Sequence, residues 1–210
     1  MFQIRHLDRK NSDEVNNIRK EAYAKAKGMA VKDSGIFWNR SDDQSIVLGV
    51  YKEDSLIATM RSEIITTLEI VEKKMECPWS YDRFSFPAMI LSKAAISSNY
   101  EGKGLTSILR FFFFKLAEKW KIKTILGTMT ANSLRIKSME SLGYRFVENH
   151  IGWKNDNYIS KEKVLISILD FEKFGTAALI KLEYKYKNFI DRQVSIDLSS
   201  VHYSEVSVVS

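Results

Sequence analysis

The chain has 210 residues, of which 45% are hydrophobic, and its 2 prolines and 9 glycines predict one folded core without long disordered linkers. The single cysteine, Cys77, excludes an internal disulfide and a cysteine-based metal cluster, and the 3 histidines have no metal-ligand spacing. The net charge of +6 comes from dispersed lysines, no apolar run is long enough to cross a membrane, and the first residues lack a secretory signal, so we expect a soluble, cytoplasmic protein that binds no nucleic acid.

The first third of the chain predicts a strand, a helix and a hairpin. Alternating apolar and polar residues indicate the strand, and apolar residues at helical spacing indicate the helix. An acidic pair between two apolar runs predicts the hairpin turn. The expected elements are a strand at Phe2–Leu7, a helix from Asn11 or Ser12 to Gly28, a loop at Gly35–Asp43, and hairpin strands at Ser45–Tyr51 and Leu56–Thr66.

The rest of the chain predicts an alternation of strands and helices, after a mixed segment at 69–86 that is expected to be irregular or helical. This order is typical of an α/β fold in which helices flank a mixed β-sheet, with a parallel crossover from the central strand to the next one. The expected elements are strands at Pro87–Ile96, Lys123–Met129, Arg145–Trp153, Val164–Leu169 and Val194–Leu198, and helices at Gly104–Lys121, Ser133–Leu142 and Phe171–Arg192.

Residues 1–170 are expected to form one domain, and residues 171–210 a C-terminal helix and strand that pack on it. The helix at Gly104–Lys121 contains four successive phenylalanines, Phe111–Phe114, which occupy a full turn and cannot share one face. We therefore expect this helix to be buried on most sides. An acyl-chain pocket and a dimer contact are the alternative interpretations of the phenylalanines.

The turn before this helix predicts an anion site. It contains Gly102, Lys103 and Gly104 between an apolar strand and the helix. A chain that enters a helix through glycines presents unpaired backbone N–H groups and the positive end of the helix dipole, although such a turn also occurs as ordinary punctuation. The dinucleotide fingerprint and the phosphate loop of NTPases do not fit, since a suitably spaced third glycine and a Gly-Lys-Ser/Thr sequence are missing. A thioester with a nucleotide tail is the ligand that remains.

This segment resembles the GNAT acyltransferases, the Gcn5-related N-acetyltransferase superfamily. Their signature of Gln or Arg, two residues, Gly, one residue, and Gly or Ala falls on residues 101–106, where Gly104 matches and Glu101 and Thr106 depart from it. Tyr100 before the motif and the Gly-aromatic pair at 143–144 after it add to the resemblance.

The resemblance implies a GNAT-like fold and acyl transfer from a pantetheine thioester, acyl-CoA or acyl-carrier protein, to the primary amine of a small molecule, without a metal. It also implies which residues hold the donor, through backbone contacts to the thioester, contacts to the pyrophosphate and contacts to the pantetheine arm. The residues at the thioester are Ala95, Ile96 and Ser97. Those at the pyrophosphate are Glu101, Gly102, Lys103, Gly104, Leu105 and Thr106, and the one at the pantetheine arm is Asn132.

Two features separate this chain from a simple acetyltransferase. Met139 occupies the position of the tyrosine that protonates the leaving thiolate in many members, and it has no proton to donate. The chain also resembles the acyl-homoserine-lactone synthases and N-acyl amino acid synthases, which share this fold and commonly take the acyl group from acyl-carrier protein. The positions that carry this second resemblance are Arg19, Tyr23, Trp38, Asp42 with Asp43, Arg61, and Arg83 with Phe84.

Four residues are the candidates for the chemistry in either branch. Arg61 and Arg83 are expected to bind an acceptor carboxylate, because guanidinium groups match its geometry, although surface salt bridges would also account for them. Glu63 and Asp82 are the candidate bases for the amine proton. A non-catalytic module that binds thioesters or a protein partner is the alternative function, and Met139 and Glu101 favour it.

Overall fold

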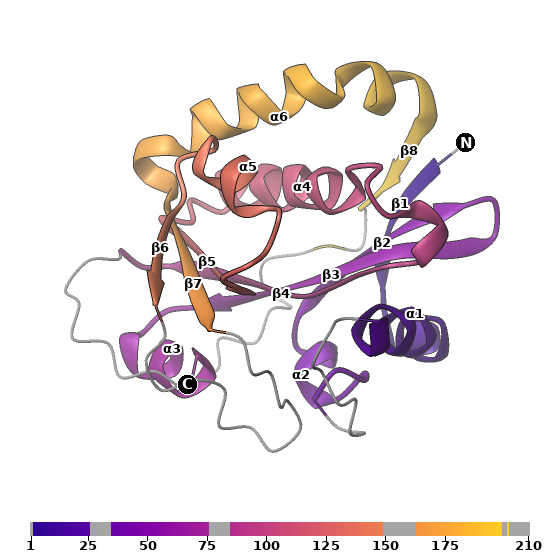
Figure 1. Cartoon of the computed structure of the whole chain (residues 1–210), viewed down its shortest axis with the longest axis horizontal. Helices are drawn as coiled ribbons and strands as arrows, with labels where there is room; N and C mark the ends of the chain where they lie inside the picture. Colours follow the sequence, from indigo (N-terminus) through magenta and orange to yellow (C-terminus); the bar gives the residue numbers. More distant parts are fainter. Residues whose placement is uncertain (1, 26–34, 76–84, 149–162, 199–200, 202–210) are drawn as a thin grey trace.

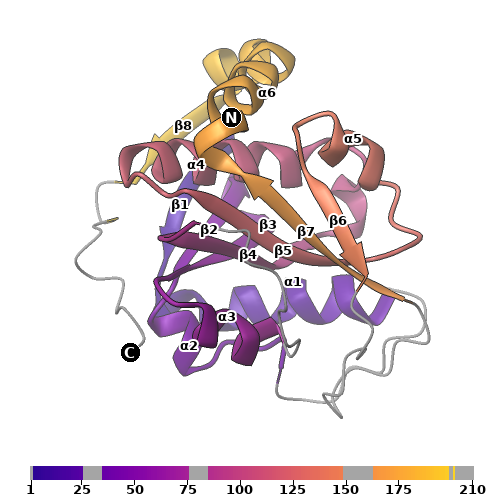
Figure 2. The same ribbon diagram turned by 90° about the vertical axis from the view of Figure 1, so that its left-hand side faces the viewer.

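The computed structural model describes residues 2–25, 35–75, 85–148, 163–198 and 201, and shows a β-sheet between two helical layers (Figure 1). Three helices, α4, α5 and α6, cover one face of the sheet, and α1, α2 and α3 cover the other, as the view turned by 90° also shows (Figure 2). The predicted mixed α/β architecture is confirmed. The strands are β1 (Phe2–Leu7), β2 (Ile46–Lys52), β3 (Ser55–Ile65), β4 (Ala88–Ile96), β5 (Thr124–Thr130), β6 (Arg145–Glu148), β7 (Val164–Asp170) and β8 (Val194–Asp197), and the helices are α1 (Ser12–Lys25), α2 (Arg40–Asp43), α3 (Leu68–Met75), α4 (Leu105–Lys119), α5 (Ile136–Glu140) and α6 (Phe171–Gln193).

The eight strands lie in the order β6-β7-β5-β4-β3-β2-β1-β8. The strands β4 and β5 are parallel, which confirms the predicted crossover through α4, and β8 pairs in parallel with β1 at the edge of the sheet. All other neighbours are antiparallel, including the predicted hairpin of β2 and β3. The C-terminal segment therefore extends the sheet as well as covering it.

Two predictions of elements need correction, and two others extend outside the described residues. The expected loop at Gly35–Asp43 contains the short helix α2, which a reciprocal pair of hydrogen bonds caps: the Asn39 side chain accepts from the Ser41 N–H at 3.0 Å, and the Asp42 carboxylate accepts from the Asn39 N–H at 3.1 Å. The helix α5 is shorter than predicted. The predicted strand from Arg145 reaches position 148, and its continuation lies outside the described residues, as does the predicted end of the first helix at Gly28.

The helix α4 forms the centre of the core on its side of the sheet. Its four phenylalanines are each at most 4% exposed, so the prediction of a helix buried on most sides is confirmed. The helix α6 packs along it, and the rings of Phe114 and Phe171 meet edge to face with centroids 5.2 Å apart. The division at residue 170 stays a prediction. Within the described part of the chain, no helix is long and apolar enough to span a bilayer.

Candidate functional site

The strands β4 and β5 separate partway along their length. They pair only over Ala88–Leu91 and Thr124–Gly127, although β4 stays paired to β3 up to Ile96 and β5 to β7 up to Thr130. An opening between residues 92–96 and 128–130 results, which we call the wedge. Because backbone N–H and C=O groups need hydrogen-bond partners, the facing edges of the wedge suit an extended ligand that carries amides.

A β-bulge lies in β4 at the start of the wedge. Thr59 pairs with Ala95 and Arg61 pairs with Ser92, so two residues of β4, at 93 and 94, stand opposite one residue of β3. Lys93 adopts a φ of 50°, in the left-handed region that residues other than glycine rarely occupy. The bulge directs its ammonium group to Asp42 Oδ2 at 2.7 Å and to the backbone carbonyl of Phe37 at 3.0 Å.

Lys93 belongs to a buried set of ionic side chains below the sheet, which we call the charge cluster. Asp42, 1% exposed, is its centre: Arg19 Nη2 lies 2.8 Å from Oδ1, and Arg61 Nη1 lies 3.8 Å from Oδ2. Arg61 Nη2 also contacts Glu63 Oε2 at 2.7 Å, and the ammonium group of Lys74 contacts the other oxygen of Glu63. Among the described residues, the charge cluster comprises the four cations Arg19, Arg61, Lys74 and Lys93 and the two carboxylates Asp42 and Glu63, so these six side chains carry an excess of two positive charges.

Burial and neighbouring charges shift the pKa values inside the charge cluster. Burial opposes the ionisation of Asp42, but Arg19 and Lys93 together hold the pKa of its carboxyl below the usual value. Burial, together with the like charge of Arg61, lowers the pKa of Lys93 to about 8. Lys93 is therefore charged at neutral pH and loses its proton slightly above it.

The lowered pKa of Lys93 predicts a rise in stability at alkaline pH. Between about pH 8 and pH 10.5 the unfolded chain holds a proton on Lys93 that the folded chain has released. Stability rises with pH wherever the unfolded state binds more protons, so this group makes the free energy of unfolding increase over that range. Urea unfolding at several pH values measures it. The Lys93→Met variant should lack this contribution, and Lys115→Met, which removes an exposed lysine of α4, should keep it. Equal pH dependence in the parent and in Lys93→Met would contradict the assignment.

The glycine turn lies at the open end of the wedge. Gly102 and Gly104 have φ values of 76° and 79°, which is the conformation that glycine favours. Gly104 is the N-cap of α4 and supplies no side-chain cap, so the first N–H groups of the helix are available to a ligand. The ammonium groups of Lys103 and Lys52 lie 4.5 and 5.7 Å from the ring centroid of Tyr100 beside the turn. The turn therefore combines a helix N-terminus with two cations, Lys103 in the turn and Lys52 of β2 beside it.

The helix α6 closes the turn from its outer side. A Cβ atom on Gly104 would lie 2.8 Å from both Cε1 and the hydroxyl oxygen of Tyr186. Real Cβ atoms do not come this close to other atoms, so any residue other than glycine at position 104 would require the Tyr186 ring to move. The C-terminal segment thus forms part of the wall of the predicted anion site.

The structure brings together some of the predicted site residues and not others. Arg61 and Glu63 meet in the charge cluster, and Ala95, Ile96 and Ser97 follow the bulge along the wedge toward the turn. Asn132 lies exposed in the loop after β5. The other two candidates, Asp82 and Arg83, lie outside the described residues.

Sequence reasoning missed two members of the charge cluster, Lys74 and Lys93. Lys93 gave a signal, because it is the only charged residue in the apolar run of β4. A lysine in a buried strand needs a partner, and Asp42 supplies it. Lys74 gave no such signal, because it follows Lys73 in a helix with an exposed polar face.

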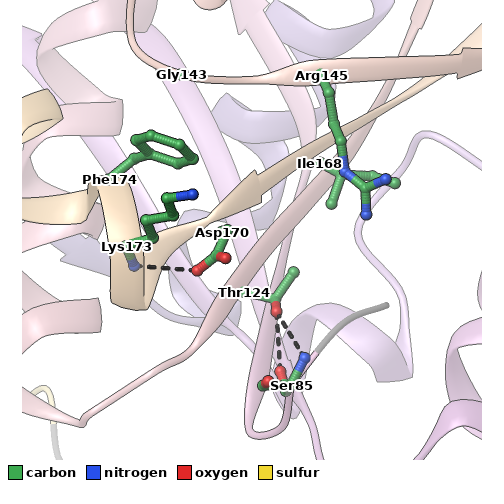
Figure 3. Close-up of a pocket in the computed structure, with 8 residues that line it drawn as sticks. All are labelled: Ser85, Thr124, Gly143, Arg145, Ile168, Asp170, Lys173 and Phe174. Carbon is green, nitrogen blue, oxygen red and sulfur yellow. Dashed lines mark hydrogen bonds between the residues drawn. The ribbon is translucent and has the colours of Figure 1, made fainter. Parts of the chain in front are cut away.

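A separate hollow of about 310 Å³ lies at the opposite end of β5 from the wedge (Figure 3). Some of its polar groups are paired with one another: the Thr124 hydroxyl donates to the Ser85 carbonyl at 2.9 Å and accepts from the Ser85 N–H at 3.2 Å, and Asp170 accepts from the backbone N–H of Lys173 at 3.0 Å. Arg145, Gly143, Ile168 and Phe174 complete the lining. No sequence feature pointed to this hollow. Among the described residues, no group of three or more His, Cys, Asp or Glu side chains is placed to hold a metal ion.

Comparison with known proteins identifies the fold. No known family profile matches the chain, and no curated protein matches it in sequence. Among solved structures, the CoA-dependent acyl-homoserine lactone synthase BjaI, with SAM and isopentyl-CoA, is 10% identical with a TM-score of 0.65, over 98% of this chain and 96% of that one. FeeM, an N-acyl amino acid synthase from uncultured soil microbes, is 12% identical with a TM-score of 0.61, over 88% and 98% of the two chains.

The fold is also similar to that of the ribosomal-protein-S18-alanine N-acetyltransferase from Escherichia coli, at 17% identity and a TM-score of 0.55 over 80% of this chain and 93% of that one. These neighbours are acyl-transferring synthases and acetyltransferases, and at such low identity the likeness concerns the fold. The expected resemblance is confirmed at that level: the chain has the GNAT fold.

Proposed function

We propose that this protein is an N-acyltransferase that moves an acyl group from a pantetheine thioester to the primary amine of a small molecule carrying a carboxylate. The observation that carries the proposal is the wedge between β4 and β5, which leads to the glycine turn at its open end and borders the charge cluster on one face of the sheet. One site therefore combines a place for a phosphate, a place for an extended arm and a place for an anion.

The wedge and the turn would hold the donor. Free backbone groups along residues 92–97 would pair with the amides of the pantetheine arm, and the first N–H groups of α4, with Lys103, would bind its phosphates. BjaI, a structural neighbour, was solved with isopentyl-CoA, which supports acyl-CoA as the donor. Acyl-carrier protein presents the same arm and is the alternative donor.

The charge cluster would hold the acceptor. Its excess of two positive charges makes a carboxylate the favoured ligand, and Arg61 is the member whose guanidinium can form a paired contact with it. Arg83 would be a second ligand. Glu63 or Asp82 would take the amine proton, and Glu63 already lies within the cluster between Arg61 and Lys74.

The acceptor site predicts a specific effect of the Arg61→Met substitution. Loss of the guanidinium should raise the KM for the acceptor at least about tenfold, because a charge-assisted hydrogen bond contributes about 1.5–3 kcal/mol. Release of free thiol measures the rate, with acyl-CoA or acyl-carrier protein as donor and a panel of amino acids as acceptors. Arg9→Met is the matched control, since Arg9 forms an exposed ion pair with Asp43 outside the cluster.

One observation favours a second function, non-catalytic binding of a thioester. Met139 is 3% exposed in the core and stands where many GNAT enzymes place the acid for the leaving group. Binding of acyl-CoA without thiol release in the presence of every acceptor would establish that function. Thiol release that requires an acceptor with a carboxylate would establish the transferase.

A further inference from the structure

Arg110 is a buried arginine that has no carboxylate partner among the described residues. It lies in the second turn of α4, 6% exposed, on the side of that helix that faces α5. Its Nη2 donates to the Met139 sulfur at 3.7 Å, and its guanidinium carbon lies 6.0 Å from the centroid of the Tyr144 ring. Its Nε is buried and has no hydrogen-bond partner among the residues that the structure describes. Within the described ranges, no carboxylate lies at ion-pair distance from it.

Such an arrangement needs an explanation in terms of a ligand or a reaction. A buried charge without a counter-charge destabilises a fold, and native proteins keep very few of them. An anion that forms or binds next to Arg110 only during the reaction would explain why Nε has no partner and why no carboxylate among the described residues pairs with the guanidinium.

A second arginine reinforces the positive charge at this place. Arg135, in the loop between β5 and α5, keeps contact with solvent. Arg135 lies close enough to Arg110 for the two positive charges to repel each other, and the Tyr23 phenol lies near Arg135 as well. Two neighbouring positive charges, one of them buried, favour the binding of an anion beside Arg110.

The position of Arg110 connects it with the wedge. It lies six residues beyond Gly104, which is about 9 Å along the helix axis, and α4 returns the chain from the end of β4 to the start of β5. The helix α4 packs on β3 and β4 and lies in the same layer as α5 (Figure 1), so Arg110 belongs to the helical layer that covers this face of the sheet. The charge cluster lies in the opposite layer with α1 and α2 (Figure 2). Acceptor and leaving group would occupy opposite faces of the sheet.

We propose that Arg110 is a catalytic residue that stabilises the thiolate released from the donor, a role that rests on the proposed acyl transfer. The amine nitrogen attacks the thioester carbonyl, the carbon–sulfur bond breaks, and its electron pair goes to sulfur. The guanidinium stays protonated and pairs with the thiolate, the amine proton goes to the base or to water, and the thiolate takes a proton from water when it leaves.

Neither of the two residues beside Arg110, Met139 and Tyr144, can protonate the leaving thiolate at neutral pH. Met139 has no acidic hydrogen, and burial raises the pKa of Tyr144 to about 12, against the opposing charge and hydrogen bond of Arg110. Tyr144 is also only 5% exposed, and its ring stacks on Phe114. Charge stabilisation by Arg110 replaces proton donation, and its guanidinium already accommodates one sulfur atom, that of Met139.

The test is the ionisation of CoA thiol bound to the protein, which needs no acceptor. Ultraviolet difference spectra follow thiolate formation against pH, in a Cys77→Ser background that removes the only protein thiol. An unperturbed alkyl thiol titrates near pH 8.5, and a cation in contact lowers the pKa by about 1 to 3. We expect the bound thiol to titrate at about pH 7.5 or below in the parent, near 8.5 in Arg110→Met, and in between in Arg110→Lys.

A control variant and a CoA analogue without a free thiol distinguish the proposed role of Arg110 from other effects on CoA binding. Lys115→Met, on the same helix but exposed, should leave the lowered thiol pKa unchanged. If Arg110→Met and the parent give the same thiol pKa, the proposal is wrong. If Arg110→Met weakens S-methyl-CoA as much as CoA at every pH, Arg110 binds a phosphate and the proposal is also wrong. Failure of the parent to bind CoA at all would remove the CoA-dependent function itself, and this role with it.

Discussion

Replacing Asp42 by asparagine should lower the free energy of unfolding by about 3–5 kcal/mol, which is the range for breaking a buried ion pair from one side. Asp42 is 1% exposed and contacts Arg19 and Lys93 at 2.8 and 2.7 Å. Without its charge, these cations remain buried with no carboxylate between them, and Arg19, which is 0% exposed, cannot turn toward water. Urea unfolding at pH 7, followed by far-ultraviolet circular dichroism, measures the loss.

Asp43 provides the control, because it is the next residue in the same short helix and has the same chemistry. Its carboxylate pairs with Arg9 at 2.7 Å and with the indole N–H of Trp38 at 2.7 Å, at the surface. Surface ion pairs contribute about 0–1 kcal/mol, so Asp43→Asn should cost far less than Asp42→Asn. Equal losses in the two variants would mean that Asp42 is not the centre of a buried cluster.

The difference in the free energy of unfolding between the parent and Asp42→Asn should also depend on pH. Arg19 and Lys93 hold the pKa of Asp42 below its ordinary value despite burial, so the unfolded chain takes up the proton first as the pH falls. The stabilisation by the ionised carboxylate is therefore complete above the unfolded pKa and disappears as the pH falls through the folded one. The unfolding free energies of the parent and of Asp42→Asn should converge in acid.

The order of elements was predictable because local patterns specify it. The hairpin of β2 and β3, the glycine turn and the apolar helix α4 each depend on residues close together in the chain, and all three appear as expected. The short helix α2 was missed although its signal was present, since Asn39 and Asp42 have the spacing of a capping box.

The site was less predictable because it depends on contacts between distant segments. Arg19, Asp42 and Lys93 come from three elements, and no local pattern states that one carboxylate lies between the two cations. The bulge at Lys93 is similarly hidden, since a left-handed residue inside a strand would be expected to be glycine. The resemblance to synthases did draw attention to Arg19, Asp42 and Arg61, which do meet.

Two features of the strand pairing also could not be predicted from the sequence. The wedge exists because β4 and β5 stop pairing after Leu91 and Gly127, a matter of register rather than composition. Likewise β8 joins β1, from the other end of the chain, through parallel pairing that begins with Phe2 and Val194. Pairing between strands that lie so far apart in the chain produces no pattern in the sequence of either strand.

Replacing Gly104 by glutamate should weaken CoA binding at least about 100-fold. The new side chain requires a left-handed residue at φ 79°, meets Tyr186 at 2.8 Å, and places a carboxylate where the phosphates should approach the N–H groups of α4. Loss of two charge-assisted hydrogen bonds, at about 1.5–3 kcal/mol each, accounts for this factor. Isothermal titration calorimetry with CoA measures the affinity of each protein.

Alanine substitutions at Gly102 and Gly104 distinguish two causes of a loss in CoA affinity: strain in the backbone of the turn, and displacement of Tyr186 and the start of α4. Its φ of 76° is nearly that of Gly104, but a Cβ there would meet nothing within 4 Å. Gly102→Ala and Gly104→Ala therefore carry the same backbone strain, and only the second displaces Tyr186 and the start of α4. We expect Gly104→Ala to lose clearly more CoA affinity than Gly102→Ala. Similar losses would show that the turn acts only through its conformation, and undiminished binding in Gly104→Glu would place the phosphates elsewhere on the protein.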